Sequence, residues 1–298
     1  MRSQLLLAFL PAVGLAELAL HEYFARRAPD FADYAALAPE LLKQKQPGVP
    51  VVVAPAWAEP LVRQAAPGAF PVAELARADD SAFTRFIEVS LLGQSAPELA
   101  GYSIEAERRA GPFTLRVRKN PRPEPVLFDF VSAVDDGAAE VFMRLDDALV
   151  PCLFHRVGRA TTGGLHGHIA YPAERYECPG GRSVGVTLLD DATYRARRCI
   201  LVQPPVTGSV LLRFSGLPNS PRFVGFRGVS YFLERDDASV QAELTLREPG
   251  QEPARVAVVG AAGWARFEQP RSVASDSLEV EVRAFRPGVD ACFALEAR

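Results

Sequence analysis

Two histidines separated by one residue, His166 and His168, are the feature of the sequence best suited to metal chemistry. Alternate side chains of a strand point to the same side, so two imidazoles at this spacing can share one ion. Glu174 is the candidate third ligand, although Pro172 intervenes. A Gly-rich surface loop with two solvated histidines is the interpretation we favour. No metal site and no cofactor are therefore predicted.

A second candidate site lies where an apolar, β-branched run at 49–54 gives way to a predicted helix. The end of such a strand is the usual place for a ligand in an open α/β sheet. Trp57, Glu59 and Arg63 are positioned to line a crevice there. The run is followed by no Gly-rich phosphate loop, and the chain has no G-x-S-x-G motif and no lone cysteine nucleophile. Trp57 and Arg63 are therefore candidate ligand contacts, with simple packing as the alternative for Trp57, and no catalytic residue is predicted.

The four cysteines, Cys152, Cys178, Cys199 and Cys292, all lie in the second half of the chain. They form no C-x-x-C pair and lack the spacing of a structural zinc site, so we predict disulfides. Of the three pairings, we favour Cys152 with Cys178 and Cys199 with Cys292, because the second bond would tie the first strand of a strand-rich region to its last. That bond would contribute about 4 kcal/mol. Four buried free thiols in a cytosolic protein remain the alternative.

The region between Cys199 and Cys292 has a hydrophobic period of two, which is typical of strands with one buried and one wet face. Even-numbered residues are apolar in 239–247, and 278–284 alternates in the same way. Upstream, strands are expected at 126–131, 141–145 and 184–189, and no convincing helix follows residue 125. Many short strands with turn residues between them indicate an antiparallel sandwich or barrel.

Residues 30–119 predict a small α/β domain instead. Helices are expected at 31–46, with Asp30 as N-cap, at 57–64 and at 79–93, and strands at 49–54, 102–108 and 113–118. Three prolines within 120–125 can continue neither a helix nor a strand, so they mark the boundary. The fold class predicted is α+β with two domains: a small N-terminal α/β domain, then an all-β antiparallel, jelly-roll-like sandwich at 125–298 that is expected to fold without the first 120 residues.

The first 22 residues resemble a targeting segment. Met1-Arg2-Ser3 precede an apolar run from Leu5 to Ala16, and Gly14-Leu15-Ala16 offers a small-x-small cleavage site. An uncleaved membrane anchor is the alternative if Leu18 to Leu20 are included, and an ordinary first helix of a soluble protein is another. Export to an extracytoplasmic compartment, periplasmic or secreted, is the expectation.

Two stretches near the C-terminal end, 263–267 and 290–294, are similar to the last strands of sandwich modules that bind sugars. The block from about 185 to 298 resembles a galactose-binding-type jelly roll, over about a third of the chain. The resemblance implies that the first and last strands lie side by side, sometimes joined by a disulfide, and that ligands are contacted by loops at one end of the sandwich.

Aromatic and arginine side chains are the usual sugar contacts, because the apolar face of a sugar packs on a ring and its hydroxyls need fixed donors. Arg227, Tyr231 and Trp264 are the candidates here. For Trp264, packing in the core is the favoured alternative.

The net charge of -3, with both signs interspersed, gives no basic field for nucleic acid. The leading hypothesis is an exported, non-catalytic envelope protein whose sandwich binds carbohydrate or an envelope protein. One alternative is an enzyme acting on cell-surface glycans, with its site in the α/β domain or the inter-domain cleft. Another is a structural subunit of a membrane-associated assembly. The position of a concave pocket with convergent polar groups distinguishes these hypotheses.

Overall fold

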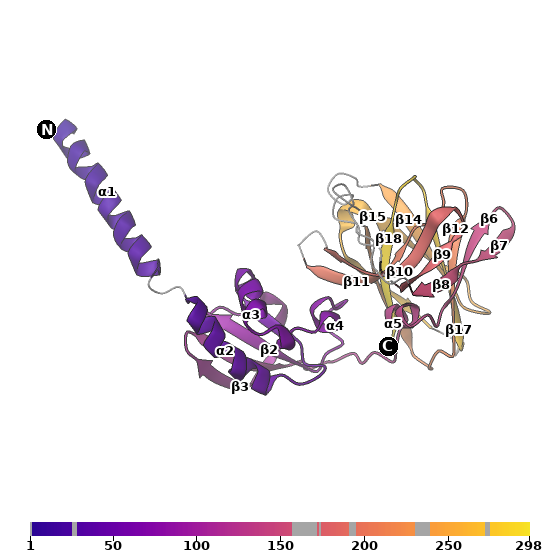
Figure 1. The fold of residues 1–298 in the computed structure, drawn as a ribbon, viewed down its shortest axis with the longest axis horizontal. Helices are drawn as coiled ribbons and strands as arrows, with labels where there is room; N and C mark the ends of the chain where they lie inside the picture. The colour runs from indigo at the N-terminus through magenta and orange to yellow at the C-terminus, as the bar shows by residue number, and fades with distance from the viewer. Residues whose placement is uncertain are drawn as a thin grey trace. The chain divides into compact units, whose positions relative to one another are not determined.

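The computed structural model describes residues 2–25, 29–156, 172, 174–190, 195–229, 239–271 and 275–298. Its fold is α+β, as predicted, with more residues in strands than in helices and with mainly antiparallel sheets (Figure 1). The chain divides into two compact units. The first comprises Met1–Pro71 and Arg85–Pro121, and the second comprises Val72–Thr84 and Arg122–Arg298. The domain ranges predicted from the sequence, 30–119 and 125–298, stay a prediction.

The N-terminal segment forms helix α1 (Arg2–Ala25). Its described apolar side chains, including Leu15, Leu18 and Leu20, are exposed. No helix in the part of the chain that the structure describes has the length and apolar content to cross a membrane. Whether this segment is a signal or an anchor stays a prediction.

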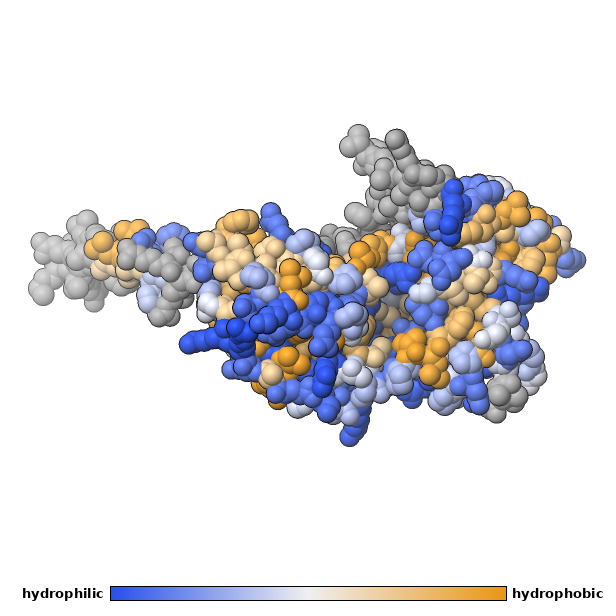
Figure 2. Space-filling model, turned by 60° about the horizontal axis from the view of Figure 1, so that its bottom comes forward, coloured by the Kyte–Doolittle hydropathy of each residue, from blue (hydrophilic) through white to orange (hydrophobic). Residues whose placement is uncertain are grey.

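The first unit contains a four-stranded mixed sheet of order β1-β2-β4-β3, in which only β1 and β2 are parallel. The strands are β1 (Val51–Ala54), β2 (Arg85–Leu91), β3 (Ser103–Ala110) and β4 (Phe113–Lys119). The helical elements are α2 (Phe31–Gln44), η1 (Ala56–Ala58), α3 (Glu59–Ala65), η2 (Pro67–Ala69) and η3 (Pro97–Leu99). The side chains of edge strand β3 are exposed along nearly all its length. Figure 2 shows hydrophilic and hydrophobic residues side by side on the surface of the molecule. Charged residues on an exposed edge discourage pairing with another strand.

Helix α2 begins at the predicted N-cap. The Asp30 carboxylate accepts a hydrogen bond from the Asp33 N–H (2.9 Å), and the Asp33 carboxylate accepts one from the Asp30 N–H (3.0 Å). This reciprocal capping box satisfies two N–H groups that a helix end leaves free. Tyr34, in the first turn of α2, is buried and packs on Phe113 of β4, with ring centroids 5.1 Å apart. The predicted helix is confirmed, and Pro39 lies inside it without dividing it.

The helix predicted at 79–93 is wrong, because Arg85–Leu91 is strand β2. Apolar residues at Phe86, Ile87 and Leu91 fit a helical spacing. They are equally the pattern of a strand buried on both faces, and β2 lies between β1 and β4 with every residue after Arg85 buried. Aromatic and β-branched residues favour the strand.

The second unit is a sandwich of two sheets. The larger has the order β16-β13-β18-β11-β10-β9-β8, with β5 pairing on β18. Its strands are β5 (Phe128–Asp129), β8 (Leu153–Arg156), β9 (Glu174–Cys178), β10 (Arg182–Asp190), β11 (Ala196–Val202), β13 (Arg222–Val229), β16 (Ala265–Pro270) and β18 (Ala291–Ala297). The smaller has the order β15-β14-β17-β12-β6-β7. Its strands are β6 (Glu140–Leu145), β7 (Ala148–Pro151), β12 (Ser209–Ser215), β14 (Val240–Arg247), β15 (Ala254–Val259) and β17 (Ser277–Ala284).

The core lies between the two sheets. The alternation of β17 is confirmed, since Leu278, Val280 and Val282 are buried. One short helix was not predicted: Phe130–Asp135 is α5, where a strand at 126–131 was expected. The Asp129 carboxylate caps it by accepting from the Val131 N–H (2.9 Å), and Phe130, Val131 and Val134 are buried in the core. A cap and an i, i+1, i+4 apolar set suffice to fix a helix this short.

Both predicted disulfides are present in the sandwich. Cys152 joins Cys178 with a Cα–Cα distance of 4.4 Å, and Cys199 joins Cys292 at 5.7 Å. The second bond links neighbouring strands, because β11 pairs with β18 in antiparallel register. The expected adjacency of these two strands is confirmed.

Residues Val72–Thr84, called the strap below, belong to the sandwich although they lie between two parts of the first unit in the sequence. The strap begins with helix α4 (Val72–Leu75). Its backbone carbonyls accept hydrogen bonds from the Arg198 N–H at Ala76 (2.8 Å) and from Trp264 Nε1 at Ala78 (3.2 Å). The strap is thereby tied to strand β11 and to the residue preceding β16.

Candidate functional site

A polar hollow of about 650 Å³ lies beside the β9–β10 hairpin of the sandwich. We call it the β9–β10 groove, and its polar lining consists of Arg175, Glu177, Arg182, Ser183 and Gln203. Tyr176 and Val184 pair across the hairpin and are buried in the core. Because strand side chains alternate, their neighbours Arg175, Glu177 and Ser183 point away from the core. The hairpin therefore gathers polar groups from two strands on one face.

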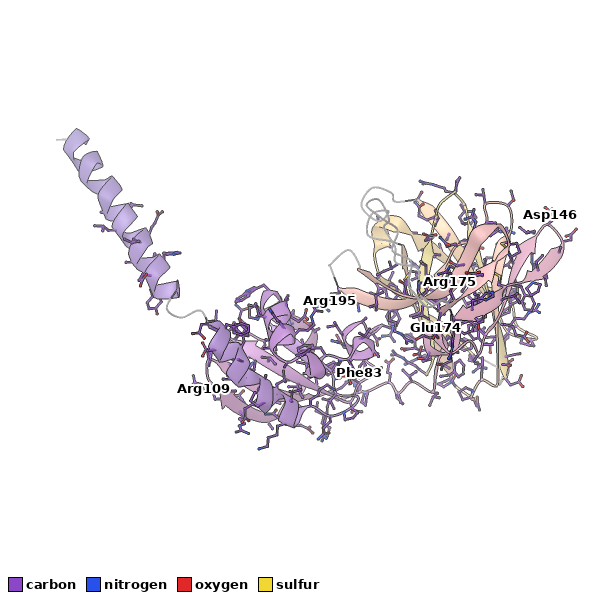
Figure 3. The ribbon with its side chains drawn as sticks, in the orientation of Figure 1. Phe83, Arg109, Asp146, Glu174, Arg175 and Arg195 are labelled. Carbon is purple, nitrogen blue, oxygen red and sulfur yellow. A yellow bond between two sulfur atoms is a disulfide. The ribbon has the colours of Figure 1, made fainter. Side chains whose placement is uncertain are left out.

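Arg175 and Glu177 form an ion pair at the wall of the groove, with Nη2 and Oε1 3.1 Å apart. Arg175 Nη1 also donates to the Pro172 carbonyl (3.1 Å). The arginine side chain is mostly covered, with 15% exposed, whereas 47% of the Glu177 side chain is exposed. Arg175 thus fixes the position of the Glu177 carboxylate, which remains accessible to solvent. Figure 3 shows Arg175 beside Glu174 on β9.

Ser183 and Gln203 form the floor. Ser183 Oγ donates to Gln203 Oε1 (3.0 Å), and Gln203 Nε2 donates to Asp290 Oδ1 (3.0 Å). Burial raises the pKa of Asp290, against the opposing effects of the Gln203 hydrogen bond and the Arg182 charge. This chain of bonds fixes the Gln203 amide, so that its orientation does not have to be ordered when a ligand binds.

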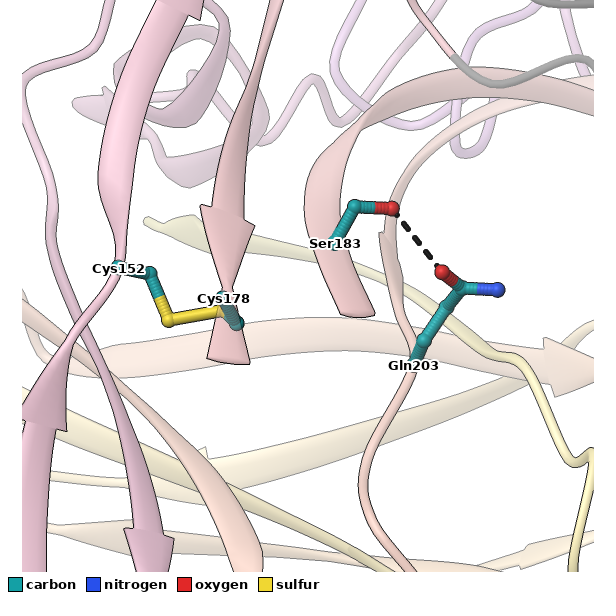
Figure 4. The surroundings of a disulfide bond; sticks show 4 residues. All are labelled: Cys152, Cys178, Ser183 and Gln203. Carbon is teal, nitrogen blue, oxygen red and sulfur yellow. Dashed lines mark hydrogen bonds between the residues drawn. A yellow bond between two sulfur atoms is a disulfide. The ribbon is translucent and has the colours of Figure 1, made fainter. Parts of the chain in front are cut away.

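The Cys152–Cys178 disulfide holds the end of β9 next to this floor (Figure 4). Cys152 lies between β7 and β8, where the chain passes from the smaller sheet to the larger. Gly180 and Gly181 make the hairpin turn with φ of 71° at both, a conformation that favours glycine. Gly185 leaves room for Pro172, whose Cγ would lie 2.6 Å from a Cβ there. The groove is therefore built on a cross-linked, closely packed hairpin.

The predicted ligand contacts of the first unit lie on its helical segment. Trp57 is on η1 with 61% of its surface exposed. Arg63, on α3, forms an ion pair with Glu59 one turn earlier, Nε to Oε1 3.4 Å. No hollow described for the first unit includes either residue. Their role as ligand contacts stays a prediction.

Of the predicted contacts of the sandwich, Arg227 and Trp264 do not line the β9–β10 groove. Trp264 stacks on Phe226, with centroids 6.0 Å apart and planes at 7°, and packs on the Cys199–Cys292 disulfide. Arg227 is half-buried, and its Nε and Nη1 have no hydrogen-bond partner among the described residues. Burial lowers the pKa of its guanidinium. Tyr231 lies outside the described residues. All three stay predictions as sugar contacts.

Of the weak metal candidates, only Glu174 is among the described residues. His166 and His168 lie outside the described residues. Glu174, on β9, is within 3.6 Å of Arg156 across the β8–β9 pair. Within the ranges that the structure describes, no three His, Cys, Asp or Glu side chains are grouped closely enough to hold a metal ion.

Sequence reasoning missed the groove residues. One signal was available: Arg175 and Glu177 flank Tyr176, and Ser183 precedes Val184, so each strand of the hairpin alternates polar and apolar residues around the Gly180-Gly181 turn. Pairing the two strands across this turn would have brought the polar positions together. Gln203 and Asp290 join the floor from distant segments, and no local pattern marks them.

No protein-family model and no curated protein matches the chain. The solved structures that match include several carbohydrate-binding modules and a family GH115 glucuronidase. They include the second family 51 module of Clostridium perfringens ZmpB with GlcNAc (10% identity, TM-score 0.28) and TmCBM61 with beta-1,4-galactotriose (13%, 0.29). A third is the xylan-binding first family 22 module of Paenibacillus barcinonensis Xyn10C (12%, 0.26).

Coverage of these structures is partial. The three matches cover 38%, 59% and 40% of this chain, and 25%, 100% and 82% of the respective structures. The chain thus spans a quarter of the ZmpB structure. The predicted resemblance to sugar-binding jelly rolls is confirmed. At these TM-scores the resemblance carries no argument about what this chain binds.

Proposed function

We propose that the sandwich binds carbohydrate in the β9–β10 groove. The observation that carries this proposal is a hollow whose polar groups converge and are already fixed by one another. Sugar hydroxyls need both donors and acceptors at set positions, and the groove offers a guanidinium, a carboxylate and an amide within one hairpin and its neighbour. Fixed groups reduce the entropy that binding must offset.

The chain as a whole is proposed to be an exported envelope protein. The two disulfides support an oxidising compartment, since such bonds persist mainly outside the cytosol. The segment 1–22 would be its signal or anchor. Binding without catalysis is part of the proposal: Glu177 is engaged by Arg175 and Asp290 by Gln203, so each carboxylate has a positioning partner.

A glycan array probed with the full chain tests the proposal, with two matched variants. Glu177→Gln removes a half-exposed, arginine-paired carboxylate in the groove. Glu107→Gln removes one of the same kind in the first unit, 52% exposed and 2.7 Å from Arg116. We expect E177Q to weaken glycan binding about tenfold, because hydrogen bonds to charged groups are the stronger ones, and E107Q to leave it unchanged.

Two results would contradict this. Equal loss in both variants, or no glycan retained by the wild-type chain, would mean that the groove is not a carbohydrate site. Release of reducing ends from a bound glycan would instead favour an enzyme acting on cell-surface glycans.

A further inference from the structure

The charges of the β9–β10 groove are not balanced. Its guanidinium groups belong to Arg175 and Arg182, and its carboxylate belongs to Glu177. Arg175 and Glu177 neutralise each other through their ion pair at 3.1 Å. Arg182 is left with the Pro204 carbonyl, 3.4 Å from its Nη1, and makes no ion pair with any described residue.

Asp290 is the acidic group that acts on Arg182 from behind the floor. Its carboxylate is bonded to Gln203 Nε2 and lies farther than ion-pair distance from the Arg182 guanidinium. Burial of Asp290 also raises its pKa and so favours its neutral form. Most of the Arg182 N–H donors therefore remain available, at the mouth of a hollow and beside the glycine turn.

We infer that the groove is selective for acidic glycans, with Arg182 binding the carboxylate of a uronic acid residue. This inference rests on the proposed function and names its ligand class. A planar guanidinium matches a carboxylate with two parallel hydrogen bonds. The half-exposed Glu177 carboxylate, held by Arg175, is then an acceptor for ring hydroxyls.

The test compares tetragalacturonate with its fully methyl-esterified form, which keeps the sugar chain and replaces each carboxylate charge by a neutral methyl ester. Calorimetric titration of the full chain should show the acid bound about tenfold more tightly than the ester, with the difference shrinking at high salt. Arg182→Gln should remove the preference. Arg182→Lys should retain part of the preference, since lysine keeps the positive charge but cannot form the bidentate pair of hydrogen bonds. Arg213→Gln, at a 41% exposed arginine of the smaller sheet, is the control and should change neither affinity.

The outcomes separate the two proposals. Acid and ester bound equally, with both weakened by E177Q, would overturn the acidic preference and leave carbohydrate binding standing. Binding of neither probe, with neutral glycans retained on the array, would do the same. No binding of any glycan would overturn both. Thermal melts of R182Q and R213Q that match the wild type exclude unfolding as the cause of a loss.

Discussion

At the scale of single residues, the first unit buries a carboxylate that is paired with two arginines and hydrogen-bonded to a backbone N–H. Glu88 on β2 is 0% exposed. Its Oε2 lies 2.7 Å from Arg118 Nη2 and 3.4 Å from Arg116 Nη1, and its Oε1 accepts from the Ala96 N–H (2.7 Å). A buried charge costs free energy unless it is paired and hydrogen-bonded. The loop around Ala96 is thus held on the sheet by this carboxylate.

We predict that Glu88→Gln lowers the free energy of unfolding by about 3–5 kcal/mol, because it leaves buried guanidinium charge without its partner. Glu107→Gln removes the exposed partner of Arg116 and should cost under about 1 kcal/mol. Urea unfolding of the full chain measures both. Equal costs would mean that burial adds nothing to the Glu88 pair.

A second buried carboxylate belongs to the sandwich. Glu296 on β18 lies against Arg298, whose Nε is 2.7 Å away, and feels the charges of Asp79 and Asp129. The pKa of Glu296 is raised from 4.5 to about 7: burial is the largest cause, Arg298 opposes it, and the two aspartates add to it. The folded state therefore holds a proton that the unfolded chain has already released between these pH values.

The stabilising contribution of protonated Glu296 is complete below about pH 4.5, declines as pH rises, and is lost above about pH 7. We expect the melting temperature of the full chain to fall between pH 5.5 and 7.5. Glu296→Gln, which is neutral throughout, should flatten that slope; an unchanged slope would assign it to other groups.

At the scale of elements, period-two alternation predicted strands of the sandwich such as β14 and β17. It failed where a strand is buried on both faces, as at β2, and where glycine interrupts the pattern, as in β13 with Gly225 and Gly228. The favoured cysteine pairing succeeded because it required only that β11 and β18 be neighbours. The groove was not predicted, since Gln203 and Asp290 reach it through pairing that no local sequence records.

Gly225 shows why β13 tolerates no side chain at that position. A Cβ there would lie 2.0 Å from Cζ of Phe267, which comes from the neighbouring strand β16. We predict that Gly225→Ala destabilises the chain by about 1–3 kcal/mol through overpacking. Gly101→Ala, where nothing lies within 4 Å, is the matched control. A melt for G225A that equals that of G101A would show that the Phe267 ring moves aside freely.

At the scale of the whole molecule, the sandwich unit is assembled from two stretches of sequence. The strap supplies Asp79, whose Oδ1 lies 2.8 Å from Arg298 Nη2, and Ser81, which accepts from the same guanidinium. Arg298 has 1% of its side chain exposed. Sequence analysis predicted that 125–298 folds without the first 120 residues; removing the strap from this unit would leave Arg298 and Trp264 short of partners.

We therefore predict that a fragment of residues 122–298 folds with a lower melting temperature than the full chain. A synthetic peptide of residues 72–84, added in excess, should raise the melting temperature of the fragment, because ligands of the native state stabilise it. A scrambled peptide is the control. A fragment as stable as the full chain would show that the strap contributes no net stability to the sandwich.

Strand β18 occupies the middle of the larger sheet, between β13 and β11, and β5 also pairs with it. It leaves the ribosome after every other described strand. Until it arrives, β11 and β13 have no common neighbour, Cys199 has no partner, and the two halves of the sheet cannot join. The sandwich is thus expected to close, and the Cys199–Cys292 bond to form, only after synthesis of β18.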